Sequence, residues 1–87
     1  MSGEDGIGSV LKKFIVDNYL AGGQEPLGDH DSFLKKGIID SIGVIELTTF
    51  VQRTFNIKVE VKEILPENFD TIHDLERYIQ EKLTEHK

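Results

Sequence analysis

The chain has 87 residues, of which 38% are hydrophobic and none is cysteine, and its formal net charge is −6. We expect one domain spanning residues 1–87, because this length leaves no room for a second domain. It also leaves little room for a deep substrate cavity of the usual ~300 Å³ or more, which argues against a self-contained enzyme. The negative charge argues against binding to nucleic acid, and the lack of cysteine excludes disulfides and a thiol nucleophile.

The first residues are polar and glycine-rich. Residues 1–8 lack the basic and apolar segments of a secretory signal, and no apolar run approaches the ~20 residues of a membrane span. We therefore expect a cytoplasmic protein without membrane insertion, and we expect residues 1–6 to be disordered.

A first helix is predicted from Ile7 to Tyr19, because apolar residues recur there at intervals of three and four. Gly22-Gly23 is expected to end it, since glycine adopts backbone conformations that are costly for other residues. A long ordered loop is expected next, from Gln24 to Gly37. Its apolar anchors are predicted to be Leu27, Phe33 and Leu34.

A second helix is predicted to start at Asp40 or Ser41, either of which can accept a hydrogen bond from an unpaired amide of the first turn. After it, residues 55–61 alternate apolar and polar with a period of two, which by itself predicts a strand. Because a lone strand would leave its backbone groups unpaired, we predict instead an extended connector. It leads to a short helical turn near Lys62–Leu65, which Pro66 is expected to end.

A last helix is predicted after Thr71, which can cap it and has Asp74 three residues further on. The apolar residues of this helix are Ile72, Leu75, Tyr78, Ile79 and Leu83. The predicted fold class is therefore all-α, with three main helices, one short helix and a long loop between the first two helices.

The tripeptide Asp40-Ser41-Ile42, within the segment from Gly37 to Leu47, resembles the signature of acyl and peptidyl carrier proteins. In that family an Asp-Ser-Leu or Asp-Ser-Ile tripeptide opens the second helix. The resemblance covers about nine-tenths of the chain and implies an acyl-carrier-like helical bundle. Further residues that match the family pattern are Asp31-Ser32-Phe33 and Gly37 in the loop, Glu46-Leu47 in the second helix, and Pro66 to Ile72 at the entry to the last helix.

The resemblance implies that Ser41 holds a 4'-phosphopantetheine arm, which a phosphopantetheinyl transferase moves from coenzyme A onto the serine hydroxyl. Acyl groups are then carried on the arm's thiol as thioesters, so the chain is expected to be a carrier and not an enzyme. The predicted position of Ser41 at the start of a helix suits a phosphodiester, because the free amides and the dipole there stabilise an anion. No recognisable motif links a histidine to Ser41, and the base is therefore expected to come from the partner.

The resemblance also implies that three residues near Ser41 take part in partner recognition. Asp40 is expected to cap the helix, to contact basic residues of the transferase, or to do both. Ile42 is interpreted as an exposed docking residue and not as core, and Glu46 as a partner-facing acid and not as a solvated helix charge. The implied partners are the phosphopantetheinyl transferase, an acyl- or aminoacyl-loading ligase, and synthase or transferase enzymes. The carrier itself is expected to be a monomer.

The second helix also departs from the family pattern. Where carriers of bacterial fatty-acid synthesis typically have acids, this chain has Gly43, Thr48, Gln52 and Arg53. This favours a specialised lipid, fatty-acid or polyketide route. The segment from Pro66 to Ile72 is also similar to stand-alone aminoacyl and peptidyl carriers, so a carrier of a nonribosomal-peptide-type pathway is the alternative.

Other classes of function are less favoured by the sequence. An interaction module could keep the same bundle without an arm, whereas a hydrolase built on Ser41 lacks a recognisable base and oxyanion hole. No metal site is predicted, because His30, His73 and His86 lack metal-ligand spacing. A calcium loop is rejected, since Phe33 and Leu34 occupy places that need an oxygen ligand and a turn glycine.

Overall fold

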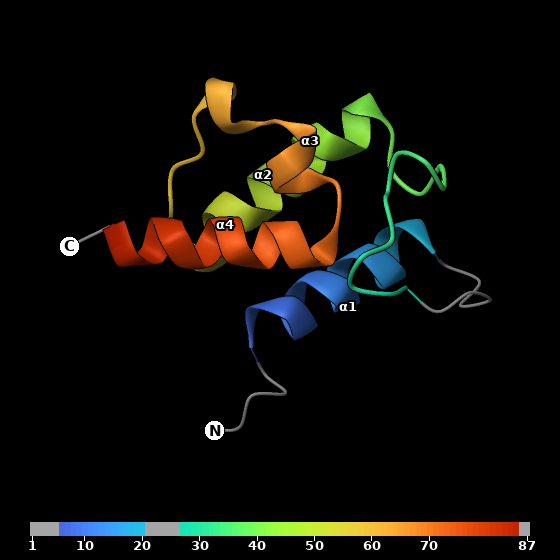
Figure 1. Cartoon of the computed structure of the whole chain (residues 1–87), viewed down its shortest axis with the longest axis horizontal. Coiled ribbons are helices and arrows are strands. Elements are labelled where there is room, and N and C mark those ends of the chain that lie inside the picture. The colour runs from blue at the N-terminus through green and yellow to red at the C-terminus, as the bar shows by residue number, and fades with distance from the viewer. Residues whose placement is uncertain (1–5, 21–26, 86–87) are drawn as a thin grey trace.

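The structure is a computed structural model that describes residues 6–20 and 27–85. These residues form α1 (Ile7–Tyr19), α2 (Ser41–Phe55), the 3-10 helix η2 (Val61–Glu63), α3 (Pro66–Phe69) and α4 (Ile72–Glu85) (Figure 1). No strand occurs within them, and the predicted all-α class is confirmed. Among the described helices, none has both the length and the apolar character needed to cross a bilayer.

The core is built from one apolar side of each main helix. α4 packs against both α1 and α3, and Figure 1 shows α3 (orange) lying over the long α4 (red) in this view. Burying a large aliphatic side chain contributes roughly 1.5–3 kcal/mol, so these packed faces hold the short helices together more than helix propensity does. The side chains with no exposed surface are Leu11 and Ile15 of α1, Leu47 and Val51 of α2, and Leu75 and Ile79 of α4.

The loop before α2 differs from the prediction at one anchor. α1 begins at Ile7 as predicted and ends at Tyr19, before Gly22-Gly23, the pair expected to end it, which lies outside the described residues. Leu27 and Phe33 are buried as predicted, but Leu34 is 49% exposed, so its assignment as an anchor is wrong. Residues 33–37 turn tightly, and consecutive side chains therefore point in different directions: Phe33 enters the core and Leu34 faces outward.

The extended connector after α2 is confirmed. Asn56 ends the helix in the left-handed conformation, with φ of 57°. Ile57 and Val59 are buried and Lys58 is exposed, so the period-two pattern marks alternate sides of a single extended segment. The side-chain oxygen of Gln52 accepts a hydrogen bond from the Val59 N–H at 2.9 Å, which pairs a backbone group that has no neighbouring strand.

The predicted short turn near Lys62–Leu65, ended by Pro66, is wrong in its bounds. The structure has η2 at Val61–Glu63 and then a separate helix, α3, which begins at Pro66. Proline suits the first position of a helix, because its fixed φ matches the helix and no intrahelical hydrogen bond needs its missing N–H. Pro66 therefore starts a helix here.

The cap of the last helix is confirmed. The Thr71 hydroxyl oxygen accepts a hydrogen bond from the Asp74 N–H at 3.0 Å, and α4 begins at Ile72. The predicted apolar side of α4 is buried as far as Ile79, whereas Leu83 is 41% exposed because it lies beyond the packed part of the helix.

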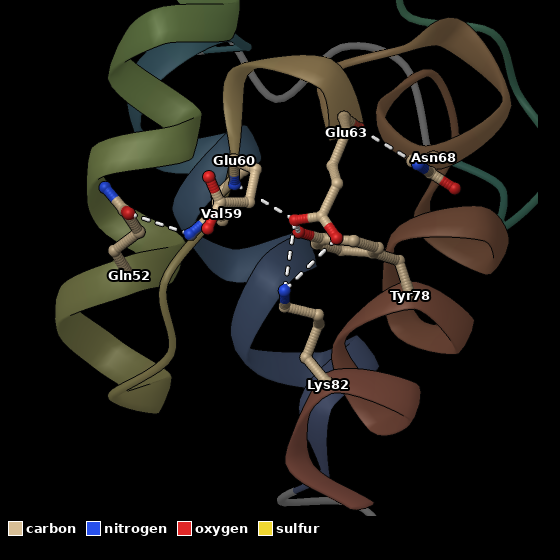
Figure 2. A network of polar contacts seen from close by, with 7 residues as sticks. All are labelled: Gln52, Val59, Glu60, Glu63, Asn68, Tyr78 and Lys82. Atoms are coloured by element: carbon tan, nitrogen blue, oxygen red, sulfur yellow. Dashed lines mark hydrogen bonds and ion pairs between the residues drawn. The ribbon is translucent and has the colours of Figure 1, made fainter. Parts of the chain in front are cut away.

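Glu63 ties the connector to α4. Its carboxylate accepts hydrogen bonds from the Glu60 N–H at 3.0 Å, the Tyr78 hydroxyl at 2.7 Å and the Lys82 ammonium at 3.0 Å. Figure 2 shows these donors gathered around the one carboxylate. Burial alone raises the pKa of Glu63, but the hydrogen bonds and the charge of Lys82 outweigh burial, so the pKa is lowered from its ordinary value of 4.5.

We predict that Glu63→Gln lowers the free energy of unfolding by about 1–2 kcal/mol at about pH 7, because the charge-assisted hydrogen bonds are lost. Because the folded-state pKa is lowered, the stabilisation by Glu63 is present above pH 4.5 and is lost as pH falls through the folded-state pKa. The difference between wild type and variant should therefore shrink in acid, as measured by urea unfolding at several pH values.

The matched control is Glu67→Gln, which removes an exposed carboxylate from the neighbouring helix α3. It should change stability by less than about 0.5 kcal/mol. A Glu63→Gln effect that stays constant as the pH falls would show that the charge of Glu63 does not stabilise the fold.

Candidate functional site

The site is built around the first turn of α2. Asp40 is the cap: its carboxylate accepts a hydrogen bond from the Gly43 N–H at 2.8 Å, and its carbonyl accepts one from the Val44 N–H at 2.9 Å. Ser41 is the first helical residue, and its side chain is exposed. The predicted helix start is confirmed, and the Ser41 hydroxyl lies where the unpaired amides and dipole of a helix favour an anion.

A groove of about 310 Å³ opens beside Ser41. Three segments form it: the loop before α2, the first turns of α2, and the stretch from the end of η2 through α3. Most of the side chains that line it are apolar, so the groove can cover an apolar group attached near Ser41. It is lined by Phe33, Leu34, Ser41, Val44, Ile45, Ile64, Leu65, Pro66, Phe69 and Asp70.

Exposed apolar side chains lie next to Ser41. Ile42 is 68% exposed, as the sequence analysis expected, and Ile45 is 64% exposed. The two residues are three positions apart and therefore share a face of α2. Sequence reasoning missed Ile45, although its spacing from Ile42 was a usable signal. Leu34 and Leu65 add exposed apolar surface at the groove.

Glu46 is exposed but has a partner within the protein. The Tyr19 hydroxyl at the end of α1 donates a short hydrogen bond to its carboxylate. Burial, together with this hydrogen bond and the negative charge, raises the pKa of Tyr19 to about 12. Glu46 therefore joins α1 to α2, and its partner-facing role stays a prediction.

The missing acids of α2 have mostly structural explanations. Gly43 and Thr48 are buried, and the Thr48 hydroxyl donates to the Val44 carbonyl at 2.8 Å. Gln52 is half-buried and binds the connector. Of the four positions only Arg53 is exposed, so reading Gly43 and Thr48 as lost surface acids is wrong.

Gly43 allows a close approach of chain segments. A Cβ at this position would lie 2.6 Å from Cγ2 of Ile39 and 3.4 Å from Cε1 of Tyr19. Ile39 is buried and immediately precedes Asp40, so it has little freedom to move away. Glycine at position 43 thus lets the loop and α1 reach the first turn of α2.

Asp70 connects the loop to the junction of α3 and α4. Its carboxylate accepts a short hydrogen bond from the Ser32 hydroxyl and another, at 2.9 Å, from the Leu34 N–H. Its backbone carbonyl accepts the Phe33 N–H at 2.9 Å. Sequence reasoning missed this role, although the two segments that meet here, Asp31-Ser32-Phe33 and Pro66 to Ile72, both belong to the quoted family pattern.

Neither His30 nor His73 lines the groove beside Ser41. The rings of His30 and His73 are tilted by 32° with centroids 4.6 Å apart, and the Asp29 carbonyl accepts the backbone N–H of His73 at 2.9 Å. In the part of the chain that the structure describes, no three metal-capable side chains gather in one place. His86 lies outside that part.

Comparisons with known proteins agree with this geometry. Residues 20–79, more than half of the chain, match the family described as a phosphopantetheine attachment site. A probable acyl carrier protein, PigG, from a Serratia species is 25% identical over 72 residues, which cover 83% of each chain. A D-alanyl carrier protein from Streptococcus pyogenes is 34% identical over 53 residues, which cover 61% of this chain and 66% of that relative, just under two thirds.

A helical bundle with a serine at the start of its second helix and a match of this extent defines a carrier protein. The chain belongs to the phosphopantetheine-attachment family, whose domain is the site of covalent attachment of 4'-phosphopantetheine. The predicted family, carrier function and cofactor are confirmed.

We predict that Gly43→Ala lowers the free energy of unfolding by about 1–2 kcal/mol. Overpacking typically costs ~1–3 kcal/mol, and the gain in helix propensity of ~1 kcal/mol offsets only part of it. The measurement is urea unfolding. The control is Gly8→Ala in α1, where the new Cβ meets only the carboxyl end of Glu76 at 3.0 Å, a flexible group. A Gly43→Ala variant as stable as Gly8→Ala would show that the close approach is not needed.

Proposed function

We propose that Ser41 is the attachment point of the arm. The observation that carries this proposal is the exposed Ser41 side chain at the first residue of α2, within the matched residues 20–79. That segment holds one other serine, Ser32. The Ser32 hydroxyl donates to Asp70 and accepts the Lys35 N–H at 3.1 Å, which commits it to the loop.

In the proposed attachment, the Ser41 hydroxyl oxygen forms a bond to the phosphorus that bears the pantetheine half of coenzyme A. The bond from that phosphorus to the nucleotide half breaks, and the hydroxyl proton passes to a base that we expect the transferase to supply. The first turn of α2 then faces the new phosphodiester with its amides and dipole. Once attached, the arm supplies a thiol on which an acyl group is carried as a thioester.

We propose that the whole chain acts as one carrier domain, without catalytic activity of its own, in the cytoplasm. We further propose that its cargo belongs to a specialised acyl or aminoacyl route. Two observations support this: the exposed Arg53 on α2 in place of an acid, and the similarity both to a probable acyl carrier and to a D-alanyl carrier. The 34% identity to the D-alanyl carrier protein is the observation that favours the aminoacyl alternative.

The proposed recognition surface consists of Asp40, Ile42 and Glu46, to which the structure adds Ile45. Ile42 and Ile45 offer apolar contact area beside the reacting hydroxyl. The carboxylates of Asp40 and Glu46 are exposed and attract a basic partner surface over a distance set by ionic strength. The expected binding partners are the transferase, a loading ligase and the enzymes that use the cargo.

We predict that the purified chain gains the mass of one phosphopantetheine group when it is incubated with coenzyme A, magnesium and a broad-specificity transferase. Ser41→Ala should abolish the gain while the chain stays folded, because the cap is Asp40 and not Ser41. Intact-mass and peptide-mapping mass spectrometry check both points. Modification of Ser32 or Ser9 instead would contradict the assignment, and the control Ser9→Ala should be modified normally.

We predict that Asp40→Asn and Glu46→Gln each slow the modification several-fold at low salt and much less above roughly 0.1 M, where the Debye length falls below ~10 Å. Asparagine still caps the helix, and glutamine can still accept the Tyr19 hydrogen bond, so mainly the charge changes. Initial rates at several salt concentrations measure the effect.

Ile42→Ala tests the apolar part of the same surface. It should slow the modification with little dependence on salt, since it removes contact area and no charge. If the two charge variants respond to salt no more than Ile42→Ala does, Asp40 and Glu46 do not steer the partner.

A further inference from the structure

We propose that Asp70 is a positioning residue for attachment at Ser41. The inference rests on the proposed function of Ser41 and assigns a role to a side chain that lines the groove beside Ser41 from the junction of α3 and α4. Three contacts join Asp70 to the loop: the Ser32 hydroxyl and the Leu34 N–H on its carboxylate, and the Phe33 N–H on its carbonyl. Together these contacts, called the Asp70 clamp below, hold three consecutive loop residues.

Backbone hydrogen bonds link the clamped residues to the segment just before α2. The Phe33 carbonyl accepts the Ile38 N–H at 2.8 Å, and the Leu34 carbonyl accepts the Gly37 N–H at 3.1 Å. Gly37 has φ of 69°, a left-handed conformation that brings the loop back on itself. The clamped residues therefore fix residues 37–38, which lead within three positions to Ser41.

The clamp also sets one wall of the groove beside Ser41. The loop contributes Phe33 and Leu34 to that wall, and Asp70 lines the same groove from the α3 side. Phe33 is held by its burial, whereas Leu34 is half exposed and depends on its backbone hydrogen bond to Asp70. Without the clamp, the loop wall can move relative to α2.

Small displacements of Ser41 are expected to slow the transfer of phosphopantetheine. The transferase must align the Ser41 oxygen with a phosphorus atom, and a shift of about 1 Å can cost up to about 100-fold in rate. Loops open at lower free energy than the core, so the clamp can be lost while the helices stay packed. The clamp therefore acts on the reaction in addition to its contribution to stability.

We expect Asp70 to act through the positions of its hydrogen-bonding atoms and not through its charge. An asparagine can keep both side-chain contacts, because its carbonyl oxygen accepts the Leu34 N–H and its amide group donates to the Ser32 oxygen. Alanine keeps neither. Asp74 is the matched control, because it is an acid four residues further along whose ion pair, at 3.9 Å, is to Arg77 of the same helix.

The experiment measures initial rates of phosphopantetheine transfer from coenzyme A over a range of carrier concentrations, well below the melting temperature of each variant. Asp70→Ala should lower kcat/KM about 10-fold, mainly through kcat, because alignment and not encounter is impaired. Asp70→Asn and Asp74→Ala should stay within about 2-fold of wild type. Hydrogen exchange of the Ile38 amide should quicken in Asp70→Ala alone.

Equal kcat/KM values for folded Asp70→Ala and Asp74→Ala would overturn the inference, as would failure of Asp70→Asn to restore the rate. If Asp70→Ala does not fold, Ser32→Ala removes one carboxylate contact and should give a loss of a few-fold; wild-type kinetics in that variant would equally overturn the inference. Peptide mapping of each product separates the two proposals, because a label on a residue other than Ser41 overturns the attachment site itself.

Discussion

The carboxylate of Asp70 sets the geometry on which the site depends. It joins the loop after α1 to the junction of α3 and α4, across 38 residues of sequence in the case of Ser32. A loop of this length in a small domain has few apolar anchors, and its backbone groups must find partners elsewhere. Asp70 provides them at residues 32–34, before the chain turns towards Asp40, the residue that caps α2.

A second constraint on the start of α2 comes from Gly43, which lies against Ile39 and the end of α1. Gly43 lets Ile39 and Tyr19 approach the first turn, and the Tyr19 hydroxyl binds Glu46 one turn later. The start of α2 is thus held by the loop, by α1 and by its own cap. The exposed side chain of Ser41 therefore projects from a turn that is held by contacts with three parts of the chain, and a rigid presentation reduces the entropy lost when a partner binds.

Local features could be predicted from the sequence because they depend on neighbours in the chain. The period of apolar residues predicts α1, α2 and α4, and the caps Asp40 and Thr71 follow from residue types at helix starts. The lone period-two segment was correctly assigned as a connector from the requirement that backbone groups be paired.

The remaining features depend on contacts between distant segments, which no local pattern contains. The outward direction of Leu34 and the clamp at Asp70 arise where the loop meets α3, and the burial of Gly43 arises where α1 meets α2. Pro66 is a different case, since proline is compatible with both the end and the start of a helix and only the packing of α3 on α4 decides between them. The carrier family itself was recognisable from the tripeptide in its register with the predicted helices.

The connector after α2 has a consequence for aggregation. Its alternating apolar residues form a segment with high β-propensity, which in an unfolded chain can pair with copies of itself. In the fold, Ile57 and Val59 are buried, and the Val59 N–H is occupied by the Gln52 side chain. Lys58 and Glu60 are exposed on the side away from Ile57 and Val59, and such charges disfavour intermolecular strand pairing. The hydrogen bond of Gln52 thus keeps a latent strand from serving as a template for intermolecular β-sheet.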